Sequence, residues 1–359
     1  MKKIFTIVLA AAALASCDNG TKYTISGSNA AFEDGKMVYM LKTENRKMTP
    51  VDSVVVEKNS FKFKGEAPEA AYMAYIAVGS SNPREAVATV PVYVEAGKIV
   101  INVVDAEKKN YNATGSLLND ANTAFSTKLS EIYERINKAY EAKDDAAIQA
   151  AQKELTDLRF NTIVENAANQ FGSDQLSRSY YQFEPQQILD IIAAMPADKQ
   201  EKLADMKKGA EQALKVAPGN PYIDITEPTP DGKQLSLKSA VENKKNKYIL
   251  LDFWASWCGP CMMEVPHLKA AYDKYHKKGF EIYAVSLDQK KENWEKAIKD
   301  KKMNWLHVSN VKYWDTPSRN DYAVNSIPAN FLIDCSTGKI VAKGLRGAAL
   351  EEKLAELLK

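Results

Sequence analysis

Two cysteines, Cys258 and Cys261, are separated by Gly259-Pro260, a spacing that suits exchange with a disulfide. The apolar stretch Tyr248–Trp254 precedes them with the length of a strand, and residues 262–278 have a helical pattern. The pair is therefore predicted on a strand-to-helix turn. A helix N-terminus stabilises a thiolate, so the pKa of a cysteine there is expected to lie below the value of about 8.5 for a free cysteine. We expect Cys258 to attack a partner's disulfide, and Cys261, one turn deeper, to resolve the mixed disulfide.

Two carboxylates flank the cysteines. Asp252 stands six residues before Cys258 inside the apolar strand, where burying a carboxylate is costly unless it has a partner. We therefore expect a buried Asp252 with a functional role. The alternative is a strand-end aspartate that faces water. Glu264 follows Cys261 by three positions on the same side of the helix. The alternative for Glu264 is a solvated glutamate, which is favourable in a first helical turn.

The pair could also be a structural disulfide or half of a zinc site. A zinc site needs further Cys or His ligands, and none of the other cysteines and histidines of the exported chain has the spacing of a second ligand pair. Redox catalysis is the favoured interpretation. Cys335 is expected to be an inert thiol because nothing basic adjoins it, and His267 to lie on a helix face. The candidates for additional zinc ligands are His267, His276, His307 and Cys335.

The N-terminus has the pattern of an export signal. Lys2 and Lys3 precede the apolar run of residues 4–14, which is too short to span a bilayer. The following Leu14-Ala15-Ser16-Cys17 resembles the lipobox of bacterial lipoproteins, in which cleavage leaves the cysteine, here Cys17, as a lipid-modified N-terminus. The alternative is a plain secretory signal, and either interpretation predicts an exported chain.

Bulk composition limits the function. An exported chain with only four cysteines does not use disulfides as scaffolding, which favours a catalytic pair. Lys and Arg number 48 against 46 Asp and Glu, and no long single-sign run suggests a nucleic-acid partner.

The pattern along the chain predicts three regions after the signal peptide of residues 1–16. Residues 17–112 are β-rich and predict an antiparallel sandwich or small barrel. Residues 113–217 predict helices, including one with the apolar face Phe125, Leu129, Ile132, Ile136 and Tyr140 and another opened by Pro185. Residues 218–359 alternate strands and helices, which predicts an α/β sheet with helices on both faces. The predicted strands are 23–27, 37–41, 53–56, 60–64, 71–78, 90–94, 98–103, 249–254, 281–287, 330–334 and 339–342.

Residues 221–359 resemble a thioredoxin-fold domain, specifically the TlpA/ResA-like extracytoplasmic thiol–disulfide oxidoreductases. The run from Leu251 to Cys261 (LDFWASWCGPC) and the later Ile327-Pro328 carry this resemblance. It covers roughly two-fifths of the chain, where Cys-x-x-Cys joins a βαβ pattern. The β-rich region resembles, more weakly, the N-terminal modules that precede such domains in some lipoproteins.

The resemblance implies roles for the residues around the cysteines. Asp252 would accept a proton from Cys261 and have a pKa raised by desolvation, and Glu264 would tune the protonation of the cysteines. Ile327-Pro328 would be a cis peptide whose Ile327 backbone pairs with a substrate strand; the alternative is a trans proline at a strand start. The other residues expected to contact substrate or frame the site are Trp257, Gly259 and Pro260.

The predicted function is a lipid-anchored thiol–disulfide oxidoreductase without metal or cofactor. The Gly-Pro dipeptide matches that of thioredoxin, whose potential is about −270 mV, which favours a reductase. The resemblance implies electrons from a membrane thiol reductase and clients among oxidised cell-envelope proteins such as apocytochromes.

Two other functions were weighed. A thiol peroxidase shares the fold, but Leu251 and Ala255 occupy the positions of its expected Pro and Thr/Ser. A surface binding protein with a passenger thioredoxin domain is the third interpretation.

Overall fold

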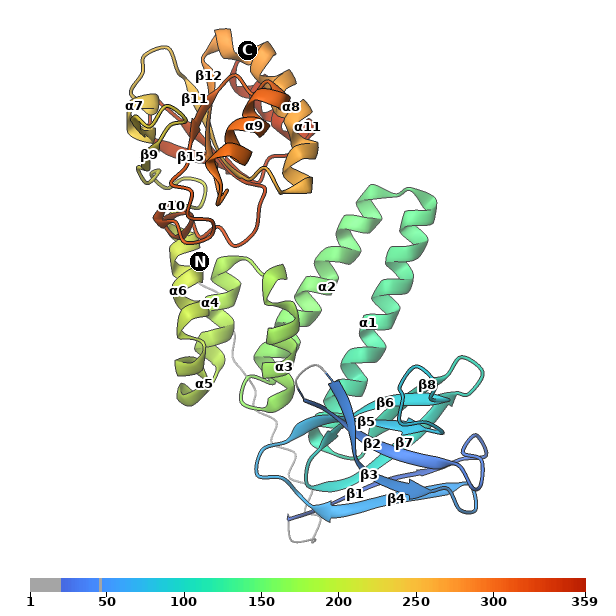
Figure 1. Cartoon of the computed structure of the whole chain (residues 1–359). Coiled ribbons are helices and arrows are strands. Elements are labelled where there is room, and N and C mark those ends of the chain that lie inside the picture. Colours follow the sequence, from blue (N-terminus) through green and yellow to red (C-terminus); the bar gives the residue numbers. More distant parts are fainter. Residues whose placement is uncertain (1–20, 45–46) are drawn as a thin grey trace, which may run out of the picture. The chain divides into compact units, whose positions relative to one another are not determined.

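The computed structural model describes residues 21–44 and 47–359. Its contacts divide the chain into two units, Met1–Gln182 and Phe183–Lys359 (Figure 1). The second unit begins at Phe183, before the boundary at residue 218 that the sequence pattern favours. The reason is that helices of the middle region pack with the C-terminal part, for example where Gln212 Nε2 donates to the Asp321 carbonyl at 2.6 Å.

The first unit contains two four-stranded sheets, in the orders β4-β1-β7-β8 and β3-β2-β5-β6 (Figure 1). Their strands pair antiparallel except for β1 and β7, which are parallel. The prediction of antiparallel sheets is confirmed, whereas β8, which lacks a clear apolar alternation, was not predicted. The strands are β1 Lys22–Ser28, β2 Met37–Glu44, β3 Lys47–Val55, β4 Ser60–Glu66, β5 Tyr72–Val78, β6 Ala88–Val94, β7 Gly97–Asp105 and β8 Asn110–Thr114.

Side chains from both sheets share one core, as in a sandwich. Phe61 and Phe63 of β4 are buried while the neighbouring Lys62 and Lys64 are exposed, as expected of a strand with one face inward. They pack in the same cluster as Ile76 of the other sheet. Burying each large apolar side chain stabilises the fold by about 1.5–3 kcal/mol.

A helical hairpin follows the sandwich in the first unit. Helices α1 (Leu117–Ala142) and α2 (Asp145–Glu165) pack through a cluster that includes Ile132, Ile136 and Leu155. Tyr140, predicted on the buried face of α1, is 56% exposed, so that part of the prediction is wrong. Ile136, one turn earlier, is the last residue of this predicted face in that cluster. Helix α3 (Gln170–Ser179) and a 3₁₀ turn complete the unit.

The second unit begins with three helices and continues into a five-stranded mixed sheet, ordered β13-β12-β11-β14-β15. Strands β11, β12 and β13 are parallel, and β14 and β15 are antiparallel. Pro185 occupies the first turn of α4, as predicted. The elements are α4 Pro185–Ala194, α5 Ala197–Lys202, α6 Ala204–Lys215, β9 Thr226–Pro228, β10 Gln234–Ser236, α7 Leu237–Val241, β11 Tyr248–Trp254, α8 Gly259–Tyr275, β12 Phe280–Ser286, α9 Lys291–Lys301, β13 Leu306–Val308, α10 Pro317–Asp321, β14 Ala329–Asp334, β15 Lys339–Lys343 and α11 Ala348–Leu357.

Helices cover both faces of this sheet, as predicted. Leu250 of β11 packs with α8, α9 and α11 in one cluster, whereas its neighbours Ile249 and Leu251 pack with α7 in another. Successive residues of β11 thus point to opposite faces, although both faces are buried. This alternation decides which residues of the strand lie under α8.

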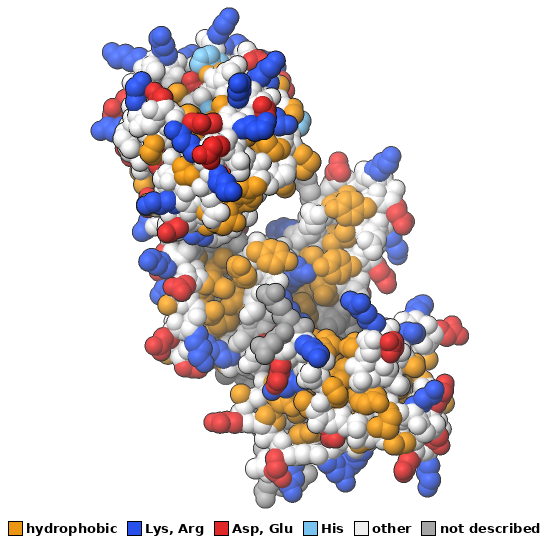
Figure 2. Space-filling model, viewed as in Figure 1, with side chains coloured by type: hydrophobic (Ala, Val, Ile, Leu, Met, Phe, Trp, Pro, Cys, Tyr) orange, Lys and Arg blue, Asp and Glu red, His pale blue; other side chains and the backbone are white. Residues whose placement is uncertain are grey.

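Acidic and basic side chains are interspersed over the face of the molecule drawn in Figure 2, in line with the balanced charge. Within residues 21–44 and 47–359, no helix combines the length and apolar character required to cross a bilayer. Cys17 and the rest of the predicted lipobox lie outside the described residues.

Candidate active site

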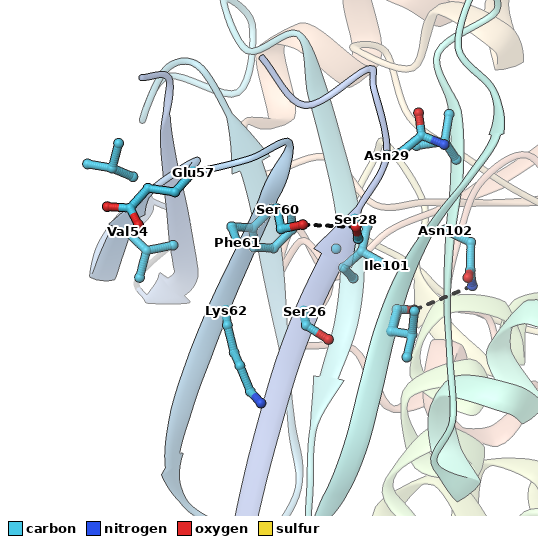
Figure 3. Close-up of a pocket in the computed structure, with 14 residues that line it drawn as sticks. Ser26, Ser28, Asn29, Val54, Glu57, Ser60, Phe61, Lys62, Ile101 and Asn102 are labelled. Atoms are coloured by element: carbon cyan, nitrogen blue, oxygen red, sulfur yellow. Dashed lines mark hydrogen bonds between the residues drawn. The ribbon is translucent and has the colours of Figure 1, made fainter. Parts of the chain in front are cut away.

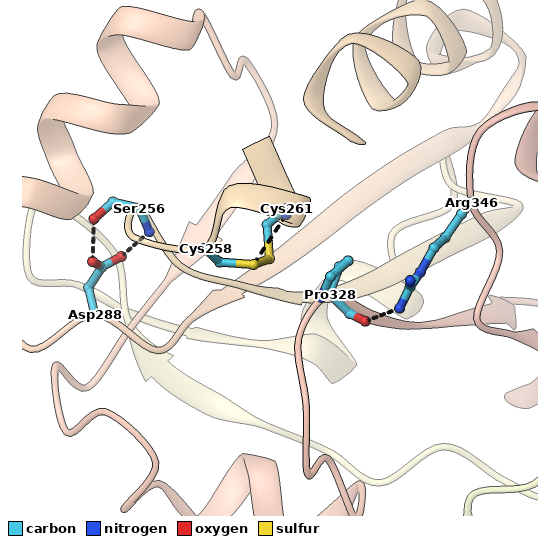
Figure 4. Close-up of a disulfide and its surroundings, with 6 residues drawn as sticks. All are labelled: Ser256, Cys258, Cys261, Asp288, Pro328 and Arg346. Carbon is cyan, nitrogen blue, oxygen red and sulfur yellow. Dashed lines mark hydrogen bonds between the residues drawn. A yellow bond between two sulfur atoms is a disulfide. The ribbon is translucent and has the colours of Figure 1, made fainter. Parts of the chain in front are cut away.

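Cys258 and Cys261 form a disulfide at the start of helix α8 (Figure 4). The strand-to-helix turn predicted from sequence is confirmed, because β11 ends at Trp254 and α8 begins at Gly259. Cys258 is the N-cap residue, and its Sγ accepts a hydrogen bond from the Cys261 amide at 3.1 Å. The helix N-terminus therefore directs a donor and its positive end at this sulfur, which stabilises negative charge there.

A buried aspartate fixes the turn that precedes the cysteines. Asp288, only 1% exposed, accepts hydrogen bonds from the amide of Ser256 at 2.9 Å and from its hydroxyl at 2.5 Å (Figure 4). It also accepts from the Ser286 hydroxyl at 2.7 Å. Asp288 was not predicted as a site residue. Its signal was an acidic side chain directly after the apolar strand of residues 281–287.

Asp252 lies on the α8 face of the sheet. It shares that side of β11 with Leu250 and Trp254, which pack in one cluster with the two cysteines. Asp252 is 4% exposed, and burial raises its pKa from 3.8 to about 7, with the nearby Glu264 carboxylate adding to the rise and Arg346 opposing it. The predicted burial and raised pKa are confirmed, and a water-facing aspartate is excluded.

Glu264 is partly buried on α8 and faces a turn far along the chain. Its Oε2 accepts a hydrogen bond from the Gly347 amide at 3.0 Å. The residue before that glycine, Arg346, donates from Nη2 to the Pro328 carbonyl at 2.7 Å (Figure 4). The Ile327-Pro328 bond is cis, as the resemblance implied. Glu264 is therefore not simply a solvated helix residue.

The remaining predicted site residues surround the disulfide. Gly259 and Pro260 form the first turn of α8, whose interior also contains Pro266. Trp257 is 48% exposed, and its ring lies 5.3 Å from that of Tyr313, measured between centroids. Tyr313 is itself 36% exposed and was not predicted. Two aromatic rings, one of them directly before Cys258 in the chain, are thus partly exposed to solvent.

The surroundings of Cys335, His267 and His307 show whether these side chains could take part in redox chemistry or bind a metal. Burial raises the pKa of the Cys335 thiol to about 12, which agrees with an inert thiol. His267 is exposed on α8 as expected, and His307 is buried with its pKa lowered to about 4 by desolvation. No cluster of three or more His, Cys, Asp or Glu suited to a metal occurs among the described residues.

A separate hollow of about 750 Å³ lies on the sandwich of the first unit (Figure 3). Its lining includes Ser28 and Ser60, whose hydroxyls are 2.8 Å apart, with Lys62 and Asn102 nearby. None of the described lining residues is a cysteine or histidine. This hollow therefore offers no groups for thiol chemistry.

The chain is similar to known proteins mainly in its C-terminal part. A family described as thioredoxin-like matches residues 246–340, and a domain of unknown function, DUF4369, matches residues 23–122. The thiol-disulfide oxidoreductase ResA of Bacillus thuringiensis subsp. konkukian is 30% identical over 154 residues, which cover 42% of this chain and 80% of that protein. ResA of Bacillus cereus (strain ZK / E33L) is 34% identical over 148 residues, covering 40% of this chain and 75% of the relative.

This chain belongs to the ResA family of thiol–disulfide oxidoreductases. The predicted thioredoxin-like fold and enzyme class are thereby confirmed, and the Cys258–Cys261 pair is the redox centre of a ResA-type domain. Among solved structures, the thioredoxin domain of a thiol-disulfide oxidoreductase from Bacteroides vulgatus is 36% identical, with a TM-score of 0.37 over 40% of this chain and 99% of that one. A thiol-disulfide oxidoreductase from Bacteroides fragilis is 37% identical, with a TM-score of 0.34 over 39% of this chain and 100% of that one.

Proposed function

We propose that this protein reduces disulfides of exported proteins, with Cys258 as the attacking thiolate and Cys261 as the resolving one. The observation that carries the assignment is the position of Cys258 at the N-cap of α8, where its Sγ accepts the Cys261 amide. The helix end that favours an anionic sulfur on Cys258 places Cys261 three residues later, inside the first turn of α8.

Each turnover moves two electrons to the client. The Cys258 thiolate attacks one sulfur of the client disulfide, so that a mixed disulfide forms and the other client sulfur leaves as a thiolate. The Cys261 thiolate then attacks Cys258 Sγ and releases the second client sulfur. The protein is left with the Cys258–Cys261 disulfide, the form that the structure holds. A dithiol donor must reduce it again.

Asp252 is the proposed proton acceptor for Cys261. Its place on the strand face that packs with both cysteines, together with a pKa near 7, supports this role at neutral pH. Glu264 is proposed to tune the site electrostatically. Its support is the charge interaction through which it raises the pKa of Asp252.

Client binding is proposed to use the surface beside the disulfide. The exposed ring of Trp257 supports an apolar contact, with Gly259 and Pro260 leaving the first turn of α8 open to an approaching chain. The cis Ile327-Pro328 segment precedes β14, and we infer that the Ile327 backbone pairs with an extended client strand.

We also propose a cellular location for the protein. We infer that Cys17 becomes a lipid-modified N-terminus, so that the enzyme works in the cell envelope, attached to a membrane. The basic start, short apolar run and Leu14-Ala15-Ser16-Cys17 support this inference. The proposed electron donor is a membrane thiol reductase, and apocytochromes are among the proposed clients.

The test is to trap the client. A Cys261→Ser variant expressed in the exporting cell should accumulate mixed disulfides on Cys258, visible as dithiothreitol-sensitive higher bands on non-reducing gels. Cys258→Ser and the double Ser variant are the matched controls and should show none. Equal trapping by Cys258→Ser would reverse the assigned roles, and absence of adducts in every variant would refute reduction by this pair.

The direction of electron flow has its own measurement. The reduction potential of the pair, determined by equilibration with glutathione or dithiothreitol, should lie near the thioredoxin value of about −270 mV. A value near the oxidising end of the range for thiol–disulfide pairs, about −120 mV, would show that the protein oxidises its clients instead.

A further inference from the structure

The turn Gly344–Gly347 joins β15 to α11 and contacts two segments of the active site. Gly344 and Gly347 have φ values of +67° and +52°, a region that side chains with a Cβ rarely adopt. The two glycines let the chain bend tightly enough for the residues between them, Leu345 and Arg346, to face the start of β14.

Asn330 holds this turn against β14. Its amide Nδ2 donates to the Leu345 carbonyl at 2.7 Å, and its Oδ1 accepts from the Leu345 amide at 2.8 Å. The Gly344 amide donates to the Asn330 carbonyl at 2.9 Å. Asn330 is 5% exposed and pairs in register with Asp252 on β11. The turn is therefore fixed two residues from the cis proline and one strand away from Asp252.

The next two residues of the turn reach the active site itself. Arg346 donates to the Pro328 carbonyl, and Gly347 donates to the Glu264 carboxylate. The Arg346 charge also acts on Asp252, where it opposes the effects of burial and of Glu264. The charged groups that bear on Asp252 are thus Glu264 from α8 and Arg346 from this turn.

We propose that Arg346 is a positioning residue for the thiol–disulfide reaction, one that holds the Pro328 carbonyl and supplies the positive charge that acts on Asp252. This inference rests on the proposed function, because it assigns Arg346 to the edge that receives the client and to the carboxylate that accepts the proton of Cys261. One side chain would then couple client binding to proton transfer.

Two consequences follow for the reaction. Without the guanidinium, the Pro328 carbonyl loses its donor, so the adjoining Ile327 backbone is held less firmly for a protein client. A small disulfide that makes no backbone pairing is unaffected by that loss. Without the positive charge, Asp252 keeps its proton to higher pH and accepts the proton of Cys261 less readily at neutral pH.

The experiment compares Arg346→Leu and Arg346→Gln with Arg346→Lys, which keeps a charge and a donor. Lys339→Leu is the matched control, because Lys339 is an exposed cation at the other end of β15, opposite Asp334 instead of near Asp252. The first readout on the full chain is the pKa of the Asp252 carboxyl by ¹³C NMR in the oxidised form. The second is steady-state reduction of insulin and of 2-hydroxyethyl disulfide, with dithiothreitol as the electron donor that reduces the Cys258–Cys261 disulfide after each turnover.

Arg346→Leu and Arg346→Gln should raise the pKa of Asp252 by about half a unit, since the charge is partly exposed and screened. They should raise KM for insulin about fivefold, the equivalent of one hydrogen bond worth about 1 kcal/mol, and leave KM for the small disulfide unchanged. Arg346→Lys should restore both values, and Lys339→Leu should change neither.

An unmoved Asp252 pKa or an unmoved insulin KM in both Arg346→Leu and Arg346→Gln overturns the role of Arg346. A KM that rises equally for insulin and the small disulfide also overturns it, because that result indicates a general structural defect. A wild-type protein that reduces neither substrate refutes the proposed function instead, and the two failures are thereby distinguished.

Discussion

Replacing Asp252 by asparagine should make the stability of the second unit respond differently to pH. Burial raises the pKa of this carboxyl from 3.8 to about 7. Between these two values the folded state binds more protons at this group than the unfolded state does, so the wild-type protein loses stability as the pH rises. The loss is complete above the folded-state pKa, where about three pKa units correspond to about 4 kcal/mol. Asparagine carries no titrating group and avoids this loss.

The assay is urea unfolding of the oxidised full chain at several pH values between 4 and 8, followed by tryptophan fluorescence. All five tryptophans lie between residues 254 and 314, so the signal reports the second unit alone. The free energy of unfolding of Asp252→Asn, minus that of the wild type, should increase by about 4 kcal/mol from pH 4 to pH 8. Any change in packing or hydrogen bonding caused by the amide adds a constant that cancels in this comparison.

Asp334→Asn is the matched control on the neighbouring strand. Burial alone would raise the pKa of Asp334, but hydrogen bonds from Ser336 and Thr337 outweigh it, and the pKa is lowered. Its carboxylate therefore stabilises the fold above its unfolded-state pKa of 3.8, and this contribution is lost only at lower pH. Between pH 4 and pH 8 the difference in free energy of unfolding between the control and the wild type should therefore stay nearly constant. A pH-independent difference between Asp252→Asn and the wild type would refute the argument that this carboxyl is held largely neutral by burial.

Three further predictions follow from the same geometry. Asp288→Ala removes the acceptor of the Ser256 amide and hydroxyl, and urea unfolding should show a loss of about 3 kcal/mol, with a smaller loss for Asp288→Asn. Desolvation lowers the pKa of His307 to about 4, so its imidazole NMR signals should titrate there instead of near 6.5, and it contributes stability that falls as the pH drops between these values. Cys335→Ser should change the rate of insulin reduction less than twofold, because burial raises the pKa of that thiol to about 12.

Local sequence patterns were sufficient to predict the redox pair and its setting. The apolar run ending at Trp254 and the helical spacing after Cys261 depend on residues close together in the chain. The position of Asp252 inside an apolar strand likewise predicted its burial, and the structure has it 4% exposed. The cis peptide at Ile327-Pro328 was predicted by resemblance and not from the physical pattern, which allowed a trans proline.

Contacts between distant segments were beyond the reach of those patterns. The Ser256 and Asp288 side chains that meet are 32 residues apart, and Glu264 and Gly347 are 83 residues apart. Tyr140 continues the helical period of its neighbours but is exposed, and its hydroxyl accepts a hydrogen bond from Gln152 of α2. It lies outside the apolar cluster between the two helices, and spacing alone did not predict where that cluster ends.

Residue types and short-range periodicity therefore specified most of the longer strands and helices and the reactive thiols of this protein. Pairing across the sheet decided which polar groups meet those thiols. The physical reason is that hydrogen bonding and periodicity within one element act over a few residues, whereas charge and desolvation at Asp252 depend on every segment folded around it.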